Sequence, residues 1–169
     1  MRKLRTYLSG GMEYAKDEGV DWRKMMEDWI VRQLQHSVFN PNVESEKFLR
    51  RTLPRVNFRK LKFRDAEKFR RVVRMIVKLD SEEIARRSDY VVCYWDKSAQ
   101  RGAGTKGELT IARFFGKPVY VVTRIQQSDI PGWVLGCTSK IFGSFDELKV
   151  FLKRRYGATS GATKRMARH

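Results

Sequence analysis

The amino-acid sequence predicts an α/β fold: a doubly wound parallel sheet, Rossmann-like or flavodoxin-like, with about five strands and helices on both faces. Short apolar runs alternate with segments whose apolar residues recur every three or four positions, as expected when strands alternate with amphipathic helices. Two runs, YVVCYW and PVYVVT, are almost continuously apolar, which is typical of strands buried on both faces of a parallel sheet. With 169 residues, 41% of them hydrophobic, the chain suits one domain over residues 1–156.

The first strand and helix are predicted within residues 4–34. The strand, LRTYLSGG, ends at a glycine pair, where the backbone can turn sharply and approach a ligand closely. Asp21 can then cap the first helix. The apolar face of this helix consists of Trp22, Met25, Met26, Trp29, Ile30 and Leu34.

A basic excursion separates the second strand from the second helix. SVFNPNV is the strand, and Asn40-Pro41 ends it because proline cannot continue a central ladder. Residues 44–63 show no clear period apart from a candidate short helix at 48–49, so we interpret them as an insertion, either a lid or a partner surface. The helix after Asp65 has an apolar face of Phe69, Val72, Val73, Ile76 and Val77.

The second half of the chain predicts three strands and two helices. YVVCYW is followed by a loop, SAQRGAG, and by a helix over residues 105–115 that Gly116 ends. PVYVVT and CTSKIFG are the last two strands, and Ser144 caps the final helix. Residues 157–169 are small, polar and basic, which predicts a disordered tail.

The excess of basic residues allows three interpretations. The sequence has 36 Lys and Arg against 19 Asp and Glu, a net charge of +17, with much of the excess in residues 50–74 and 153–169. Such runs are most often solvated faces. An anionic, phosphate-bearing substrate and nucleic acid are the alternatives, the latter because Phe58, Phe63 and Phe69 are interleaved with basic residues, although no nucleic-acid motif is present.

Composition argues against several other classes of protein. No stretch approaches the roughly 18 apolar residues of a membrane span, and the first residues lack the apolar core of a secretory signal. Cys93 and Cys137 are too few and too far apart for a zinc site or a disulfide framework, so we expect buried thiols. We therefore expect a cytoplasmic protein with no membrane contact, no metal and no cofactor.

A small-molecule site is predicted where the strand ends meet. Right-handed crossovers bring the loops at the carboxyl ends of parallel strands together along one edge, and ligands bind there. The segment GAGTKGE, residues 102–108, passes from such a loop into a helix, so its free backbone amides favour anions. Glu108, between this loop and an apolar helix face, can act as a nucleophile or base; stabilisation of the first helical turn is its alternative role.

Four segments within residues 4–152 carry a family resemblance: YLSGG, FNP, LDSEEIARRSDYVVCYWD and GAGTKGELTIARFFGKPVYVVT. In this order and spacing they resemble the nucleoside 2-deoxyribosyltransferase-like superfamily, which includes 2'-deoxynucleoside 5'-phosphate N-hydrolases. The resemblance implies a double displacement at the anomeric carbon of a deoxyribosyl nucleoside. Another base takes the glycosyl-enzyme intermediate in transferases, and water takes it in hydrolases.

The resemblance also implies roles for three residues. Glu108 matches the glutamate that attacks the sugar, Tyr7 the tyrosine that orients this carboxylate, and Asp80 an aspartate that helps to protonate the leaving base. Asp80 needs a raised pKa for this task, which burial beside the ligand could supply. Its alternative role is a helix N-cap, with Glu83 completing a capping box, and then its pKa would not rise.

Substrate contacts are expected from the strand-end loops. The candidates are Ser9, Gly10, Gly11, Asn40, Trp95, Asp96, Gly104 and Thr105. For Asn40 the alternative is a local Asx turn, and for Trp95 it is a place in the core. Arg101 and Lys106 are candidate phosphate contacts, with a surface role as the alternative for each.

Two positions depart from the family pattern. Gly102-Ala103 stands where transferases of free nucleosides typically carry an aspartate, which favours a nucleotide or modified nucleotide as substrate. Thr110 stands where glycine is common in the family.

Three functions are therefore left open. The first is an N-glycosidase or deoxyribosyltransferase for a (deoxy)nucleoside or its 5'-monophosphate. The second is a nucleotide sensor without turnover, and the third is a nucleic-acid-associated protein that uses the basic surface. The resemblance further implies a homodimer or a higher homo-oligomer.

Overall fold

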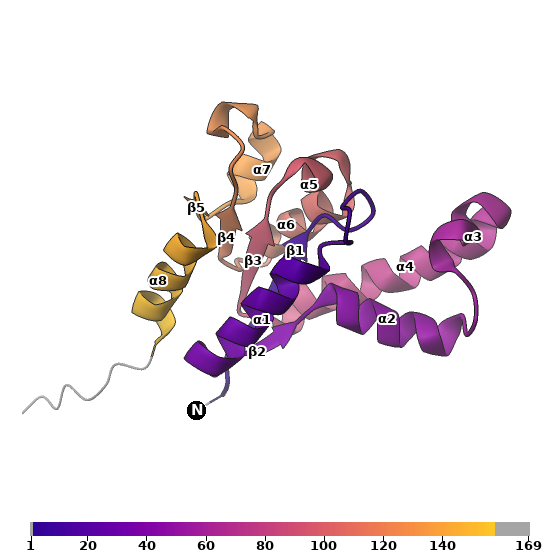
Figure 1. Ribbon diagram of the computed structural model, residues 1–169, viewed down its shortest axis with the longest axis horizontal. Coiled ribbons are helices and arrows are strands. Elements are labelled where there is room, and N and C mark those ends of the chain that lie inside the picture. The colour runs from indigo at the N-terminus through magenta and orange to yellow at the C-terminus, as the bar shows by residue number, and fades with distance from the viewer. Residues whose placement is uncertain (1, 158–169) are drawn as a thin grey trace, which may run out of the picture.

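A computed structural model describes residues 2–157 and confirms the α/β prediction (Figure 1). Its five strands are all parallel and lie in the order β2-β1-β3-β4-β5. They are β1 (Arg5–Gly10), β2 (Ser37–Phe39), β3 (Tyr90–Tyr94), β4 (Val119–Val122) and β5 (Lys140–Phe142). This is the flavodoxin-like order, in which the chain reverses direction across the sheet between β1 and β3 and opens a crevice at their carboxyl ends. The predicted tail, apart from Gly157, lies outside the described residues.

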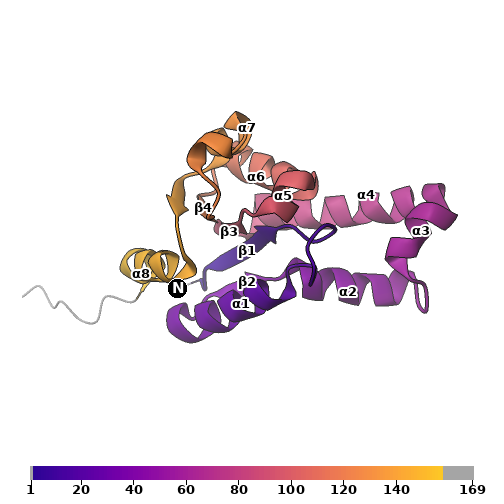
Figure 2. The ribbon, with the colours of Figure 1, turned by 45° about the horizontal axis from the view of Figure 1, so that its top comes forward.

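Helices cover both faces of the sheet (Figure 2). Alternate strand residues point to opposite faces, so Leu8 and Val92 pack under one helix layer while Tyr7 and Val91 pack under the other. The first layer consists of α1 (Val20–Leu34) and α8 (Phe145–Tyr156), and the second includes α6 (Gly104–Phe114) and α7 (Gly132–Cys137). The short helix α5 (Lys97–Arg101) occupies most of the segment predicted as a loop.

Residues 44–63 are largely helical, which corrects the prediction of an insertion without clear periodicity. Asn40 caps α2 (Pro41–Thr52), and Asn57 caps α3 (Phe58–Arg64). Both helices are short and densely basic, so their apolar periodicity is weak in the sequence. Together with α4 (Ala66–Glu82) they project from one side of the sheet, with α3 at the far end (Figures 1 and 2).

The interpretation of Asp80 as an N-cap is wrong. Helix α4 continues through this residue to Glu82, so Asp80 lies in the last turn of a helix and not at the start of one. A π-helical turn follows over residues 83–87, closed by the hydrogen bond from the Ser88 N–H to the Glu83 carbonyl. Asp21 is likewise not a cap, because α1 begins at Val20 after a glycine in the left-handed conformation.

The described chain agrees with two compositional expectations. Cys93 and Cys137 are free thiols, and both are buried. Within residues 2–157, no helix combines the length and the apolar character needed to cross a bilayer.

Part of the basic surface is balanced by acidic residues one helical turn away. Arg50 pairs with Glu46 at 2.5 Å on α2, and Arg70 pairs with Glu67 at 2.6 Å on α4. These are pairs three or four residues apart on exposed helix faces, the arrangement of a solvated helix surface.

Gly11 is required by close packing at the site edge of the sheet. A Cβ at this position would lie 1.9 Å from Ser98 Oγ and 2.7 Å from the Ala99 backbone nitrogen. We expect Gly11→Ala to lower the free energy of unfolding by about 1–3 kcal/mol, as overpacking does. Urea denaturation followed by circular dichroism measures this change.

Gly136→Ala is the matched control, because a Cβ there meets no atom within 4 Å and the residue lies inside α7. This substitution should leave the protein as stable or raise its stability by up to about 1 kcal/mol. Equal stability of the Gly11→Ala protein and the unaltered protein would contradict the packing at Gly11.

Candidate active site

Two hydroxyl groups hold the carboxylate of Glu108. The Tyr7 hydroxyl donates to Oε1 at 3.0 Å, and the Ser9 hydroxyl donates to Oε2 at 2.5 Å. Tyr7 and Ser9 are two residues apart on β1, so both side chains leave the same face of the strand, where α6 packs. Both carboxylate oxygens are therefore fixed by one strand.

Glu108 is the fifth residue of α6, beyond the first turn, so the alternative role of stabilising that turn does not account for it. The N-cap residue of this helix is Ala103, whose methyl side chain cannot accept a hydrogen bond from the first amides. Ala103, Gly104 and Thr105 line the cavity beside Glu108, which places the first amides of the helix at the site. Such amides favour electron-rich ligand atoms such as phosphate or sugar oxygens.

A buried arginine, which the sequence analysis did not identify, supports the end of β1. The Arg23 guanidinium donates to the carbonyl oxygens of Leu8 at 3.2 Å, Gly10 at 2.8 Å and Gly19 at 3.1 Å. Arg23 lies on the same stripe of α1 as the buried Met26, and only that spacing distinguishes it from the other arginines. Its charge also acts on Glu108 from inside the protein.

Opposing effects set the pKa of Glu108. Burial raises it, while the Ser9 hydrogen bond, the Arg23 charge and the Tyr7 hydrogen bond lower it, and the balance is a raised pKa. Burial, followed by the nearby Glu108 charge, raises the pKa of Tyr7 well above its usual range. Tyr7 therefore remains a phenol, which can donate a hydrogen bond to Glu108.

Asp80 lies in the same cavity and has the environment of a proton donor. Burial, and then the charge of Glu108, raises its pKa from 3.8 to about 8. Within the described chain its Oδ1 atom is buried and has no hydrogen-bond partner. A carboxyl group with this pKa is protonated near neutral pH and can give its proton to a ligand.

The structure brings only some of the predicted site residues to the cavity. Six of them line it: Gly10, Gly11, Asp80, Gly104, Thr105 and Glu108. The other two that take part, Tyr7 and Ser9, donate hydrogen bonds to the Glu108 carboxylate.

Besides Ser9, which binds Glu108, three predicted substrate contacts are not among the cavity-lining residues. Asn40 caps α2 and donates to Glu27 at 2.7 Å, Trp95 is fully buried in the core, and Asp96 caps α5. All three lie at the ends of strands, as predicted. Their side chains, however, cap helices or pack in the core.

The candidate phosphate contacts are also engaged within the chain. Lys106 donates to the Gln100 carbonyl oxygen at 2.7 Å, and Arg101 stacks over the Tyr14 ring. Thr110, the second departure from the family pattern, accepts a hydrogen bond from the Trp133 indole at 2.9 Å and so fastens α7 to α6. In the part of the chain that the structure describes, no three His, Cys, Asp or Glu side chains are grouped to hold a metal ion.

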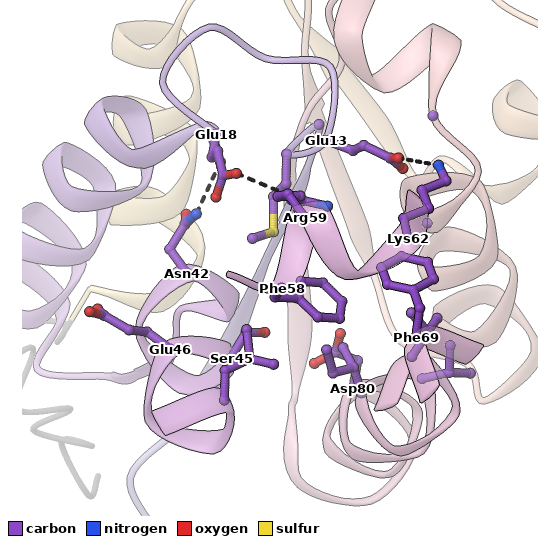
Figure 3. Close-up of a pocket in the computed structure, with 18 of the residues that line it drawn as sticks. Glu13, Glu18, Asn42, Ser45, Glu46, Phe58, Arg59, Lys62, Phe69 and Asp80 are labelled. Carbon is purple, nitrogen blue, oxygen red and sulfur yellow. Dashed lines mark hydrogen bonds and ion pairs between the residues drawn. The ribbon is translucent and has the colours of Figure 1, made fainter. Parts of the chain in front are cut away.

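The cavity has a volume of about 1390 Å³, and its lining includes Glu108 and residues of α2, α3 and α4. Figure 3 shows the part of it around Ser45, Phe58 and Asp80. Two ion pairs join α3 to the loop after β1: Arg59 to Glu18 at 3.1 Å and Lys62 to Glu13 at 2.6 Å. The walls contributed by α2 and α3 were not predicted as part of the site. The sequence indicated only that this region could be a lid or a partner surface.

This arrangement defines the class of the protein: a flavodoxin-like sheet that carries a hydroxyl-bound glutamate at its crevice. It shares this fold with a 2-deoxyribosyltransferase of the psychrotolerant bacterium Bacillus psychrosaccharolyticus, at a TM-score of 0.57 and 17% sequence identity. The match covers 86% of this chain and 90% of that enzyme. No protein-family model matches the sequence, and no curated protein does. The likeness confirms the predicted resemblance at the level of the fold.

The raised pKa of Asp80 predicts a pH-dependent stability. Between the unfolded pKa of 3.8 and the folded pKa of about 8, the unfolded chain has lost this proton while the folded chain retains it. The free energy of unfolding therefore falls as pH rises through this window. Asp80→Asn should remove this contribution and stabilise the protein at pH 8 by an amount on the order of 1 kcal/mol or more.

Urea denaturation at pH 5 and pH 8 measures the effect, and Asp146→Asn, at an exposed position on α8, is the control. The stabilisation by Asp80→Asn should be larger at pH 8 than at pH 5. A stabilisation that is equal at both pH values, or a loss of stability at pH 8, would show that Asp80 has an ordinary pKa.

Proposed function

We propose that this protein cleaves or transfers at the N-glycosidic bond of a (deoxy)nucleoside or nucleoside 5'-monophosphate, with Glu108 as the nucleophile. The observation that carries the proposal is the pairing, in one cavity, of an oriented carboxylate with a carboxyl group that keeps its proton. Cleavage of a glycosidic bond needs this pair, one group for the developing positive charge on the sugar and one for the leaving group. The shared fold supports the same chemistry.

The proposed reaction has two displacements. A carboxylate oxygen of Glu108 attacks the anomeric carbon while the carbon–nitrogen bond breaks and Asp80 gives its proton to the leaving base. This forms a glycosyl ester on Glu108. Water or a second base then attacks the same carbon, its proton passes to Asp80, and the Glu108 carboxylate is released.

Electrostatic coupling assigns the two roles. Because each carboxylate raises the cost of ionising the other, one proton is retained by the pair. The Arg23 charge and the Tyr7 hydroxyl lower the pKa of both groups, but Glu108 also accepts a hydrogen bond from Ser9, whereas the Asp80 Oδ1 atom has no hydrogen-bond partner in residues 2–157. The proton therefore resides on Asp80, which becomes the acid, and Glu108 becomes the nucleophile.

We further propose that the protein assembles as a homodimer or larger homo-oligomer. Three large apolar side chains are exposed on the neighbouring helices α6 and α7 and the turn after α6: Phe114, Phe115 and Trp133. Burial of such side chains against a second copy would remove them from water.

Base release from a panel of 2'-deoxynucleosides and their 5'-monophosphates tests the proposed activity, with chromatographic detection of free or exchanged base. Glu108→Gln keeps the size of the side chain but removes the nucleophile, so the rate should fall at least about 1000-fold. Tyr7→Phe removes one orienting hydrogen bond and should lower the rate about 10- to 100-fold. Glu67→Gln, at an exposed position on α4, is the control and should leave the rate unchanged.

The same panel separates the enzyme from a nucleotide sensor. Binding without base release would support the sensor. Activity that survives Glu108→Gln would remove this residue from the mechanism.

A further inference from the structure

The cavity continues well beyond the two carboxyl groups along one face of α4. Asp80, Ile76, Val73 and Phe69 follow one another at intervals of three or four residues, so they share a helix face, and all four line the cavity. At the α-helical rise, the eleven steps from Asp80 to Phe69 span about 16 Å. The acid of the proposed reaction therefore lies at one end of a long apolar wall.

Helices α2 and α3 supply the other walls of this extension. Leu49 of α2, Leu53 directly after α2 and Phe58 of α3 line the cavity. The Phe58 ring stacks on Phe69 with the centroids 5.0 Å apart. We call this region the distal apolar pocket. Its residues are Leu49, Leu53, Phe58, Phe69, Val73 and Ile76.

The volume of the cavity exceeds what a nucleoside needs. Sites for drug-sized ligands measure roughly 300–1,000 Å³, whereas this cavity measures about 1390 Å³. An unmodified nucleoside placed at Glu108 and Asp80 would leave the distal apolar pocket without an occupant. Helices α2 and α3 form walls around a space that a nucleoside does not fill, which favours a larger ligand.

The direction of the ligand follows from the position of the acid. Asp80 protonates the base in the proposed reaction, so the base lies on the α4 side, while the sugar lies toward Glu108 and the α6 N-terminus. A substituent on the base then points along α4 into the distal apolar pocket. Figure 3 shows Phe58, Phe69 and Asp80 lying around this part of the cavity.

The contacts that hold α3 in place favour a small ligand over a polypeptide. Helix α3 is joined to the loop after β1 by the Arg59–Glu18 and Lys62–Glu13 ion pairs, and its Phe58 stacks on α4. A helix or strand from another chain would have to break these contacts to enter. An alkyl or aryl group attached to a base could enter without breaking them.

We infer that the substrate is a modified nucleoside or nucleotide whose leaving base carries an extended apolar substituent, and that the distal apolar pocket binds this substituent. The inference rests on the proposed N-glycosidic activity for the placement of the base. The affinity it predicts is a hydrophobic one, since the pocket residues offer alkyl and aromatic surfaces to the substituent.

Binding of free bases tests the pocket without requiring turnover. Isothermal titration calorimetry would compare adenine with N6-benzyladenine, and uracil with 5-benzyluracil. In at least one pair the benzyl compound should bind about 10- to 100-fold more tightly, as expected for burial of an aromatic group. Equal or weaker binding of the benzyl compounds in both pairs would overturn the inference.

Filling the pocket tests its location. Val73→Phe places a ring in the space for the substituent and should remove most of the benzyl preference. Val150→Phe adds the same ring at an exposed position on α8 and should keep it. Ile76→Phe fills the pocket from the next turn and replaces Val73→Phe if that protein fails to fold by circular dichroism. A benzyl preference that survives a folded pocket-filling variant would place the substituent elsewhere and overturn the inference.

Turnover of the matching deoxynucleosides distinguishes failure of the inference from failure of the proposed function. Release of plain bases with no benzyl preference in binding or rate would retain the activity and overturn the inference. A benzyl preference that depends on Val73, without base release from any compound, would retain the pocket and overturn the activity.

Discussion

Glu108 meets Tyr7 and Ser9 only because α6 packs across the face of β1 from which both hydroxyl groups project. β1 is an interior strand, paired with β2 on one side and β3 on the other, so the two donors project from a strand that has hydrogen-bonded neighbours along both edges. Arg23 fixes the end of the same strand through its carbonyl oxygens. Orientation of the carboxylate is therefore a property of the whole sheet.

The second carboxyl group, that of Asp80, makes the folded state less stable when it is ionised. Asp80 lies in the last turn of α4, beside Glu108 and largely away from water, where an ionised side chain is unfavourable. Retention of its proton relieves this cost and, in the proposed mechanism, gives the site an acid. A residue that reduces stability and supplies chemistry is expected at a functional site, where proteins give up stability for activity.

The sequence was most informative where local pattern and long-range structure coincide. The buried strands were predictable because apolar runs such as YVVCYW occur mainly where both faces are covered. The place of Glu108 at the cavity was predictable from its position after a glycine-rich loop, and the places of Tyr7 and Asp80 beside it from the family resemblance. Their catalytic roles are proposals.

Arg23 was not predictable, because its burial depends on carbonyl groups that come together only in the folded chain. The helical walls of the cavity were obscured by the many basic residues on the outer faces of α2 and α3. For Asn40 and Asp96, a helix cap and a ligand contact require the same residue type at the same strand end, and the sequence does not distinguish them.

Trapping the glycosyl ester tests the role of Glu108 most directly. A nucleoside with a 2-deoxy-2-fluoroarabinosyl group slows both displacements, because fluorine destabilises positive charge on the sugar, and allows the intermediate to accumulate. Peptide mass spectrometry after incubation should find one sugar on the peptide that contains Glu108. Release of the base with the sugar on another carboxylate, or with no label on the protein, would contradict Glu108 as the nucleophile.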